Sequence, residues 1–180
     1  MADQRLTGIL LVGGASTRFG SPKALARFEG ETLAERAWRL LGDVCEETIA
    51  VGRGKGLQFP ALADEGTGPV AAIAEGLRAA THEVAVVIPV DMPLLTAGAL
   101  RLLAGACRDA AVAQAGPLPC AVARLTLPAF ETGERRLRTV LDGLDTVRVE
   151  VEERLLVNVN EPEDLRRIAT FEDDRTRGRT

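Results

Sequence analysis

The sequence contains only one histidine, His82, and this scarcity excludes whole classes of catalytic site. A zinc site built from several histidines needs more of them than the chain has. His82 stands directly before an apolar run, where a place in a surface turn is expected, so a histidine-based catalytic triad is excluded as well. The three cysteines, Cys45, Cys107 and Cys120, are odd in number and widely spaced, with no Cys-x-x-Cys pair. We therefore expect reduced thiols and a cytoplasmic location instead of a disulfide framework.

Long hydrophobic runs are also missing, and this bears on the partners of the protein. No apolar run is long enough to span a membrane, and residues 1–5 lack the basic flank and apolar core of a signal peptide. The formal net charge of −4 argues against non-specific binding of nucleic acid. A small anionic substrate is compatible with this charge, because it responds to nearby arginines more than to the net charge. We thus expect neither a membrane nor a nucleic acid as partner.

Strand-like and helix-like segments alternate along the 180 residues, a length typical of one domain. Apolar runs predict strands at Leu6–Val12, Glu47–Val51, Val84–Val90, Ala110–Ala115, Pro119–Arg124, Thr146–Val151 and Leu155–Val157. Apolar stripes at helical spacing predict helices from Leu33 after a Thr-x-x-Glu capping box, from Pro69, after Thr96, and across Leu137–Leu144 and Glu161–Ala169.

Such repeated strand–helix units predict an α/β fold, a Rossmann-like three-layer αβα sandwich with a mostly parallel central sheet. We expect residues 1–170 to form this single domain. Residues 171–180, which are rich in charge, are expected to form a flexible tail.

A glycine-rich loop follows the first predicted strand and is the most informative stretch of the chain. Residues 10–23 read Leu-Leu-Val-Gly-Gly-Ala-Ser-Thr-Arg-Phe-Gly-Ser-Pro-Lys. The paired glycines Gly13 and Gly14 let backbone N–H groups approach an anion closely, and Arg18 and Lys23 supply positive charge for a triphosphate. The spacing is neither that of a P-loop nor that of Gly-x-Gly-x-x-Gly. A glycine-rich turn with two solvated basic residues is the structural alternative.

A second motif, Pro89-Val90-Asp91-Met92-Pro93-Leu94, lies at the end of the apolar run Val84–Val90. A carboxylate in this position is well placed to hold Mg²⁺ against phosphate oxygens, although aspartates are also common in turns. Ligands of parallel sheets bind beyond the carboxyl ends of the strands. Asp91 should therefore lie near the glycine loop, as should Asn158 and Asn160, which follow the run ending at Val157.

These stretches resemble the molybdenum cofactor guanylyltransferases, a family of nucleotidyltransferases. The loop is similar to their signature Leu-Ala-Gly-Gly-x-Ser-x-Arg-Met-Gly-x-x-Lys, from which Val12 and Phe19 depart. The Asp91 motif resembles their Pro-Cys-Asp-x-Pro, with valine in place of cysteine. Asp64, followed by Gly68-Pro69, resembles an aspartate and a Gly-Pro-Leu-Ala-Gly-Ile segment across a shorter loop.

Two later stretches, Gly133-Glu134-Arg135-Arg136 and Asn158-Val159-Asn160-Glu161-Pro162-Glu163-Asp164-Leu165, resemble family motifs assigned to the pterin substrate. Arginine suits a phosphate, and asparagine amides suit a hydrogen-bonding heterocycle. Helix capping is the structural alternative for Asn160. Gly52-Arg53-Gly54 stands where the family usually offers an asparagine to the nucleotide.

The resemblance implies an enzyme in which the terminal phosphate of molybdopterin attacks the α-phosphate of GTP, so that GMP is transferred and pyrophosphate leaves. It implies catalytic roles for Arg18, Lys23 and Asp91, with Asp91 as ligand of Mg²⁺ or Mn²⁺. It also implies that the nucleotide is contacted by Leu11, Val12, Gly13, Gly14, Lys23, Asp64 and Asp91. The acceptor, and not GTP, would be served by Arg135, Arg136, Asn158 and Asn160. Transient contacts with other proteins of cofactor biosynthesis are expected.

Three other functions stay open at the level of the sequence. The nearest is a cytidylyltransferase that uses CTP, but those enzymes resemble Leu-Ala-Ala-Gly at the loop, whereas Gly13 matches the guanine form. A second is a nucleotidyltransferase acting on phospholactate or a sugar phosphate, which the arginine and asparagine motifs disfavour. A third is a catalytically inactive nucleotide-binding protein, which the presence of both Lys23 and Asp91 disfavours.

Overall fold

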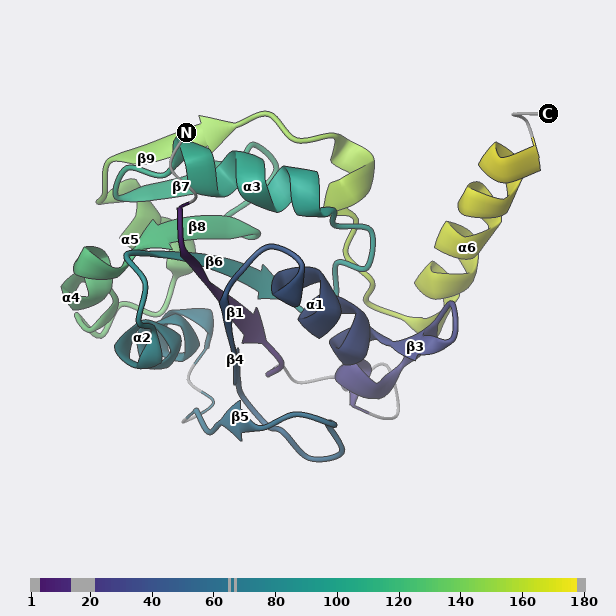
Figure 1. The fold of residues 1–180 in the computed structure, drawn as a ribbon, viewed down its shortest axis with the longest axis horizontal. Coiled ribbons are helices and arrows are strands. Elements are labelled where there is room, and N and C mark those ends of the chain that lie inside the picture. Colours follow the sequence, from purple (N-terminus) through teal and green to yellow (C-terminus); the bar gives the residue numbers. More distant parts are fainter. Residues whose placement is uncertain (1–3, 14–21, 65, 67, 178–180) are drawn as a thin grey trace.

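The computed structural model describes residues 4–13, 22–64, 66 and 68–177. Within them, the middle layer is a seven-stranded sheet in the order β5-β4-β1-β6-β8-β7-β9 (Figure 1). Its strands are β1 Leu6–Leu11, β4 Glu47–Val51, β5 Ala61–Leu62, β6 Val84–Pro89, β7 Ala110–Ala113, β8 Cys120–Ala123 and β9 Thr146–Val149. Neighbouring strands are parallel except where they pair with β8. The predicted α/β fold with a mostly parallel sheet is confirmed.

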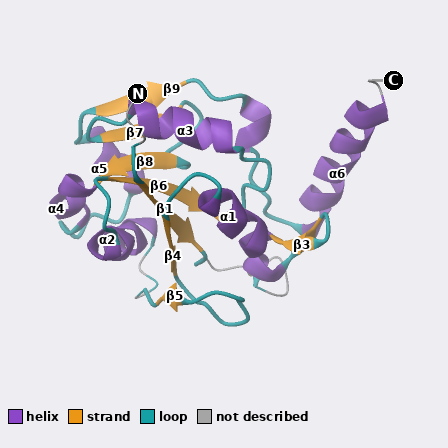
Figure 2. Cartoon of the chain, viewed as in Figure 1, coloured by secondary structure: helices purple, strands orange, loops and turns teal. Residues whose placement is uncertain are grey.

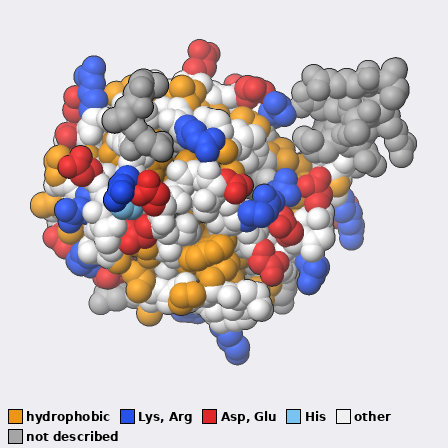
Figure 3. Space-filling model, viewed as in Figure 1, with side chains coloured by type: hydrophobic (Ala, Val, Ile, Leu, Met, Phe, Trp, Pro, Cys, Tyr) orange, Lys and Arg blue, Asp and Glu red, His pale blue; other side chains and the backbone are white. Residues whose placement is uncertain are grey.

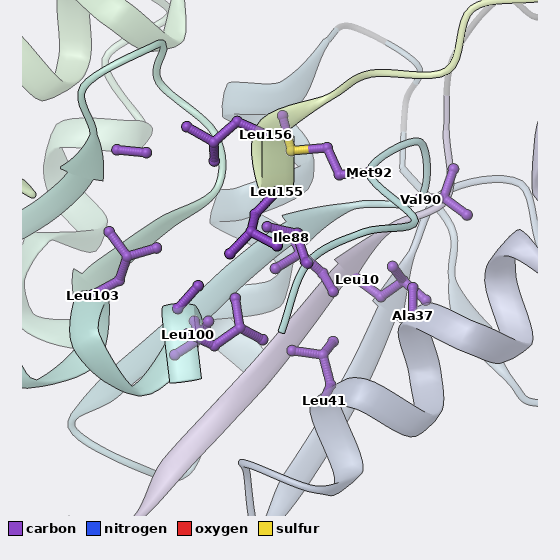
Figure 4. Packing of buried hydrophobic residues seen from close by; sticks show 14 of the residues in the cluster. Leu10, Ala37, Leu41, Ile88, Val90, Met92, Leu100, Leu103, Leu155 and Leu156 are labelled. Carbon is purple, nitrogen blue, oxygen red and sulfur yellow. The ribbon is translucent and has the colours of Figure 1, made fainter. Parts of the chain in front are cut away.

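Helices cover both faces of this sheet, and the alternation of side chains along β1 shows why. The helices are α1 Leu33–Gly42, α2 Pro69–Ala79, α3 Ala97–Ala106, α4 Leu127–Phe130, α5 Leu137–Asp142 and α6 Pro162–Arg177. Leu10 of β1 packs in one buried cluster with Leu41 of α1 and Leu100 of α3, part of which Figure 4 shows. Ile9, its neighbour on the strand, belongs to the cluster on the other face with Ile73 of α2. The three layers follow from this alternation.

The helix starts that the sequence predicts are confirmed at the level of hydrogen bonds. The Thr32 hydroxyl accepts a hydrogen bond from the Glu35 N–H at 3.1 Å, and the Thr32 N–H donates to the Glu35 carboxylate at 2.8 Å. The Thr96 hydroxyl caps α3 by accepting from the Ala99 N–H at 3.3 Å. Pro69 is the first residue of α2, where its missing N–H costs nothing.

One predicted strand is wrong. Leu155–Val157 is not a strand, because residues Glu153–Leu156 form a 3₁₀ turn in which the Leu155 N–H donates to the Glu152 carbonyl at 2.9 Å. Leu155 and Leu156 are both buried in the same core cluster. Adjacent strand residues would point to opposite faces of a sheet, so the turn is the conformation that buries both on one side.

Several short elements were not predicted (Figure 2). They are the two-stranded hairpin of β2 Arg27–Phe28 and β3 Glu31–Thr32, the edge strand β5, and α4. The last helix, α6, was expected to end at Ala169 but continues to Arg177, so it includes part of the expected tail. In Figure 1 its far end stands away from the sheet.

Three further observations concern the surface charges, the apolarity of the helices and the cysteine thiols. Figure 3 shows acidic and basic side chains interspersed over the visible face. Among the described helices, none has the length and apolarity that a membrane crossing requires. The three cysteines are free, and burial raises the pKa of the Cys45 thiol to about 12.

Candidate active site

The carboxyl ends of β4, β1 and β6 lie side by side and carry the predicted site. Backbone pairing continues past the last strand residues, since the Val12 N–H donates to the Val51 carbonyl at 3.0 Å and the Val90 N–H donates to the Leu11 carbonyl at 3.2 Å. The segments that follow, at Gly13, Gly52 and Asp91, therefore leave one edge of the sheet together. This is the edge where parallel α/β sheets bind ligands.

On one side of the site, two glycines are in close contact. Gly52 has φ +129°, and a Cβ at this position would lie 2.6 Å from the Gly13 nitrogen. The backbone of Gly52 is thus packed directly against the start of the glycine loop. A Cβ at Gly13 would by contrast meet only ordinary contacts among the described residues, with the Asp64 Oδ2 at 3.8 Å. Gly13 and Asp64 therefore lie side by side, where the sequence predicts the nucleotide.

The centre of the site is an ion pair between the two predicted catalytic residues. Lys23 lies in a 3₁₀ turn, Lys23–Leu25, and its Nζ donates to Asp91 Oδ2 at 3.0 Å. The same ammonium donates to Asn160 Oδ1 at 3.2 Å. The two charged side chains are largely shielded, with 16% of Lys23 and 23% of Asp91 exposed. Three residues far apart in the sequence therefore meet at one point.

The C-terminal segment reaches this point by a backbone contact. The Val159 N–H donates to the Asp91 carbonyl at 2.8 Å, and the Val159 side chain is fully buried. Asn158 and Asn160 flank this anchor on either side. The sequence placed them at the edge as residues that follow a strand, whereas the structure brings them there through the 3₁₀ turn Glu153–Leu156 and this hydrogen bond.

A cavity of about 330 Å³ opens next to Asp91. It is lined by Pro89, Asp91, Met92, Ala115, Gly116, Pro117, Leu118, Leu156 and Asn158. Most of these side chains are apolar, and Asp91 and Asn158 supply the polar groups. In the sequence, Gly116-Pro117 lies between the predicted strands Ala110–Ala115 and Pro119–Arg124, with no feature of its own that indicates a site. Its place at the site depends on β8 lying next to β6, which the sequence did not show.

The chemistry of Asp91 suits a hard divalent cation. Its second oxygen, Oδ1, is buried and has no hydrogen-bond partner in the part of the chain that the structure describes. The same residues include no group of three or more potential metal ligands among His, Cys, Asp and Glu. Mg²⁺ usually binds through one or two carboxylates together with substrate phosphates and water. A single carboxylate with an unsatisfied oxygen fits that mode of binding.

Comparison with known proteins identifies the family of this site. The model of the MobA-like NTP transferase domain matches residues 8–151. The chain belongs to this family. It is therefore a nucleotidyltransferase, and the residues that meet at Lys23, Asp91 and Asn160 lie at the edge where such an enzyme is expected to bind its substrates.

Curated relatives and solved structures agree with this assignment. A "probable molybdenum cofactor guanylyltransferase" from Chloroflexus aggregans is 33% identical over 92% of this chain and 94% of its own length. A molybdenum cofactor guanylyltransferase from Xanthomonas euvesicatoria is 33% identical over 90% of this chain and 93% of its own. The structure of molybdopterin-guanine dinucleotide biosynthesis protein A from Archaeoglobus fulgidus superposes with a TM-score of 0.77. It is 23% identical and covers 93% of this chain and 99% of its own, which supports the fold.

The other residues predicted around the glycine loop are only partly described by the structure. Leu11 and Val12 are buried, and the Leu11 carbonyl and the Val12 N–H already bond to neighbouring strands. Because Leu11 also pairs with Pro89, which has no N–H, its own N–H is bonded within the sheet as well. Gly14 and Arg18 lie outside the described residues.

The predicted arginine pair lies in the loop before α5. The backbone N–H groups of Arg135 and Arg136 donate to Glu134 Oε1 at 2.7 and 2.8 Å, and these bonds lower the pKa of Glu134. Both arginines are exposed. The Arg135 carbonyl lies 3.9 Å from where a Cβ of Gly68 would stand, which places the pair beside the start of α2.

Proposed function

We propose that this nucleotidyltransferase moves GMP from GTP to the terminal phosphate of molybdopterin, with release of pyrophosphate. The observation that carries the proposal is the convergence of Lys23, Asp91 and Asn160 beside a cavity that Asp91 lines. The curated relatives are named molybdenum cofactor guanylyltransferases, which supports transfer of a guanylyl group, and Lys23 and Asp91 have the charges that such a transfer needs. Phosphoryl transfer of this kind depends on alignment and charge neutralisation and needs no covalent nucleophile.

Each residue then has a physical task. Lys23 neutralises charge on the triphosphate, together with Arg18 of the glycine loop. Asp91 would hold Mg²⁺ or Mn²⁺, and that ion, when bound, supplies further positive charge against the phosphate oxygens. Gly13 and Gly14, together with Leu11, Val12 and Asp64, would contact the nucleoside.

The cavity beside Asp91 is the proposed site of the acceptor. Its apolar wall suits the flat face of a heterocycle, and Asn158 offers amide groups that can bond the edge of such a ring. Because Asp91 lies at the border of this cavity, an acceptor phosphate placed there would be near the nucleotide. Arg135 and Arg136, in the loop before α5, would attract the acceptor by their charge.

The setting of the reaction is also proposed. Three free thiols suit a reducing compartment, and we propose a cytoplasmic enzyme with transient contacts to other proteins of cofactor biosynthesis.

The choice of nucleotide can be measured by isothermal titration with GTP, CTP and ATP in the presence of Mg²⁺. Gly13 has no Cβ, so the backbone can approach a purine edge closely. GTP should bind more tightly than CTP by at least about tenfold, or about 1.4 kcal/mol. Equal affinities, or tighter binding of CTP, would contradict the guanine assignment and favour the cytidylyltransferase alternative.

A further inference from the structure

We propose that Asp164 is a positioning residue, which acts through Asn160 to hold the Lys23 ammonium in place for the phosphates of a nucleoside triphosphate. The inference rests on the proposed role of Lys23 toward the nucleotide. The asparagine motif would then contribute to binding of the nucleotide, in addition to the binding of the acceptor that the sequence suggests.

Hydrogen bonds connect Asp164 to Lys23 through one residue, Asn160. Asp164 Oδ2 accepts from the backbone N–H of Asn160 at 2.8 Å and from that of Glu161 at 3.0 Å. The carboxylate therefore fixes the backbone of Asn160. The side-chain oxygen of Asn160 in turn accepts from Lys23 Nζ at 3.2 Å. A change at Asp164 is thus transmitted to the lysine through a single intervening residue.

The segment that contains Asn160 is held in place by buried residues on both sides. On one side, Val159 is buried and bonded to the Asp91 carbonyl. On the other side, Leu165 and Ile168 of α6 are buried in the core cluster that also contains Leu10. Asn160 itself is exposed between these anchors. The backbone bonds to Asp164 fix the position from which the Asn160 amide reaches Lys23.

The surroundings of Asp164 favour its charged form. Hydrogen bonds from the N–H groups of Asn160 and Glu161 lower the pKa of Asp164 below its ordinary value of 3.8, and the positive charges of Arg167 and Lys23 lower it further. Asp164 is therefore a carboxylate at neutral pH. A guanidinium nitrogen of Arg167 lies 3.6 Å from the other oxygen of Asp164, Oδ1. The negative charge of Asp164 and the positive charge of Lys23 therefore attract each other, and Asn160 bonds to both residues.

A simpler role for Asp164 is to cap the start of α6, because a side chain that accepts from N–H groups at a helix start stabilises the helix. The two roles make different predictions. A cap affects stability whatever the state of Lys23, whereas a positioning residue affects nucleotide binding only while Lys23 is present. Measuring the coupling between the two positions separates these roles.

The experiment is a double-mutant cycle on the affinity for GTP–Mg²⁺, with Asp164→Ala and Lys23→Ala alone and together. Residues in one hydrogen-bond network couple measurably, so Asp164→Ala should weaken binding about fivefold or more in the wild type and by less than about twofold in the Lys23→Ala background. Glu163→Ala is the matched control, since Glu163 is an acid of the same turn that pairs with Arg166 at 2.9 Å on the surface. It should leave the affinity unchanged.

A second readout uses guanosine, which lacks the phosphates. Asp164→Ala should narrow the difference in affinity between GTP and guanosine and leave guanosine binding as it was. Equal losses for both ligands, or an undiminished loss in the Lys23→Ala background, would overturn the proposal and reduce Asp164 to a cap. If Asp164→Ala does not fold, Asn160→Ala interrupts the same series without removing the cap, and the same cycle applies.

The outcomes also separate this inference from the proposed function. If the wild type binds another nucleoside triphosphate in preference to GTP, the guanine assignment fails, and the cycle with the preferred nucleotide still supports or overturns the role of Asp164. If the wild type binds no nucleoside triphosphate, both proposals are overturned.

Discussion

Only glycine fits at position 52, because two backbones approach each other there. The φ of +129° is a conformation that other residues rarely adopt, and a Cβ would overlap the Gly13 nitrogen. The family resemblance implies an asparagine in this region that contacts the nucleotide. In this chain Gly52-Arg53-Gly54 occupies that region, and the small size of Gly52 lets Gly13 pack against the end of β4.

Gly52→Ala should therefore be destabilising and should weaken nucleotide binding. Backbone strain together with the overlap should cost about 2 kcal/mol or more of the free energy of unfolding. Gly30→Ala is the matched control, because Gly30 also has a positive φ, of +88°, but has nothing within 4 Å of where its Cβ would be. It should cost about 1 kcal/mol and leave GTP affinity unchanged. Chemical denaturation and titration of both variants provide the comparison, and equal effects of the two substitutions on binding would contradict this account.

Asp91 pairs with Lys23 through one carboxylate oxygen, Oδ2. It lies after the buried strand β6, and its Oδ1 has no hydrogen-bond partner within the described residues. Asp91→Asn, which keeps the shape of the side chain, should slow nucleotidyl transfer about hundredfold or more. Its free energy of unfolding should change by no more than about 1 kcal/mol.

The rate of this variant at increasing Mg²⁺ concentration, with its melting temperature, measures both effects. A folded Asp91→Asn enzyme with a normal rate would mean that the metal is held elsewhere. A large loss of stability with a normal rate per folded molecule would mean that Asp91 serves the structure alone.

At the scale of elements, the sequence predicts what has a strong local signal. The capping box of α1, the proline at the start of α2 and the apolar run of β6 each specify their element through neighbouring residues, and each prediction is confirmed. Leu155–Val157 was misread because three apolar residues satisfy both a buried strand and a 3₁₀ turn. The distinction comes from the tertiary packing of Leu155 and Leu156 on one side, which no local pattern contains.

The capping box of α1 gives a prediction about stability alone. Thr32→Ala removes the hydroxyl that accepts from the Glu35 N–H and leaves that donor without its partner, which should cost about 1 kcal/mol. Thr32→Ser keeps the hydroxyl and should recover most of the loss. Thermal unfolding of the two variants tests the point, and identical melting temperatures for Ala and Ser would show that the cap contributes nothing.

At the scale of the whole molecule, the rule that ligands bind beyond the carboxyl ends of parallel strands predicted the neighbourhood of the site. It placed Asp91 and the asparagine motif at the edge where β1 ends, and the structure joins Lys23 to Asp91 and Asn160 there. The cavity could not be predicted in the same way, because it depends on β8 lying antiparallel beside β6. Such a strand order is determined by packing between distant parts of the chain, so the spacing of the motifs does not predict it.

The transfer reaction itself tests the central claim most directly. The purified protein is supplied with molybdopterin, Mg²⁺ and either GTP or CTP, and release of pyrophosphate is measured together with the mass of the product. The account predicts pyrophosphate and a molybdopterin guanine dinucleotide with GTP, at a rate at least about tenfold above that with CTP. Omission of molybdopterin should abolish the release. Release of pyrophosphate with CTP at an equal or higher rate, or no transfer to molybdopterin from either nucleotide, would contradict the account.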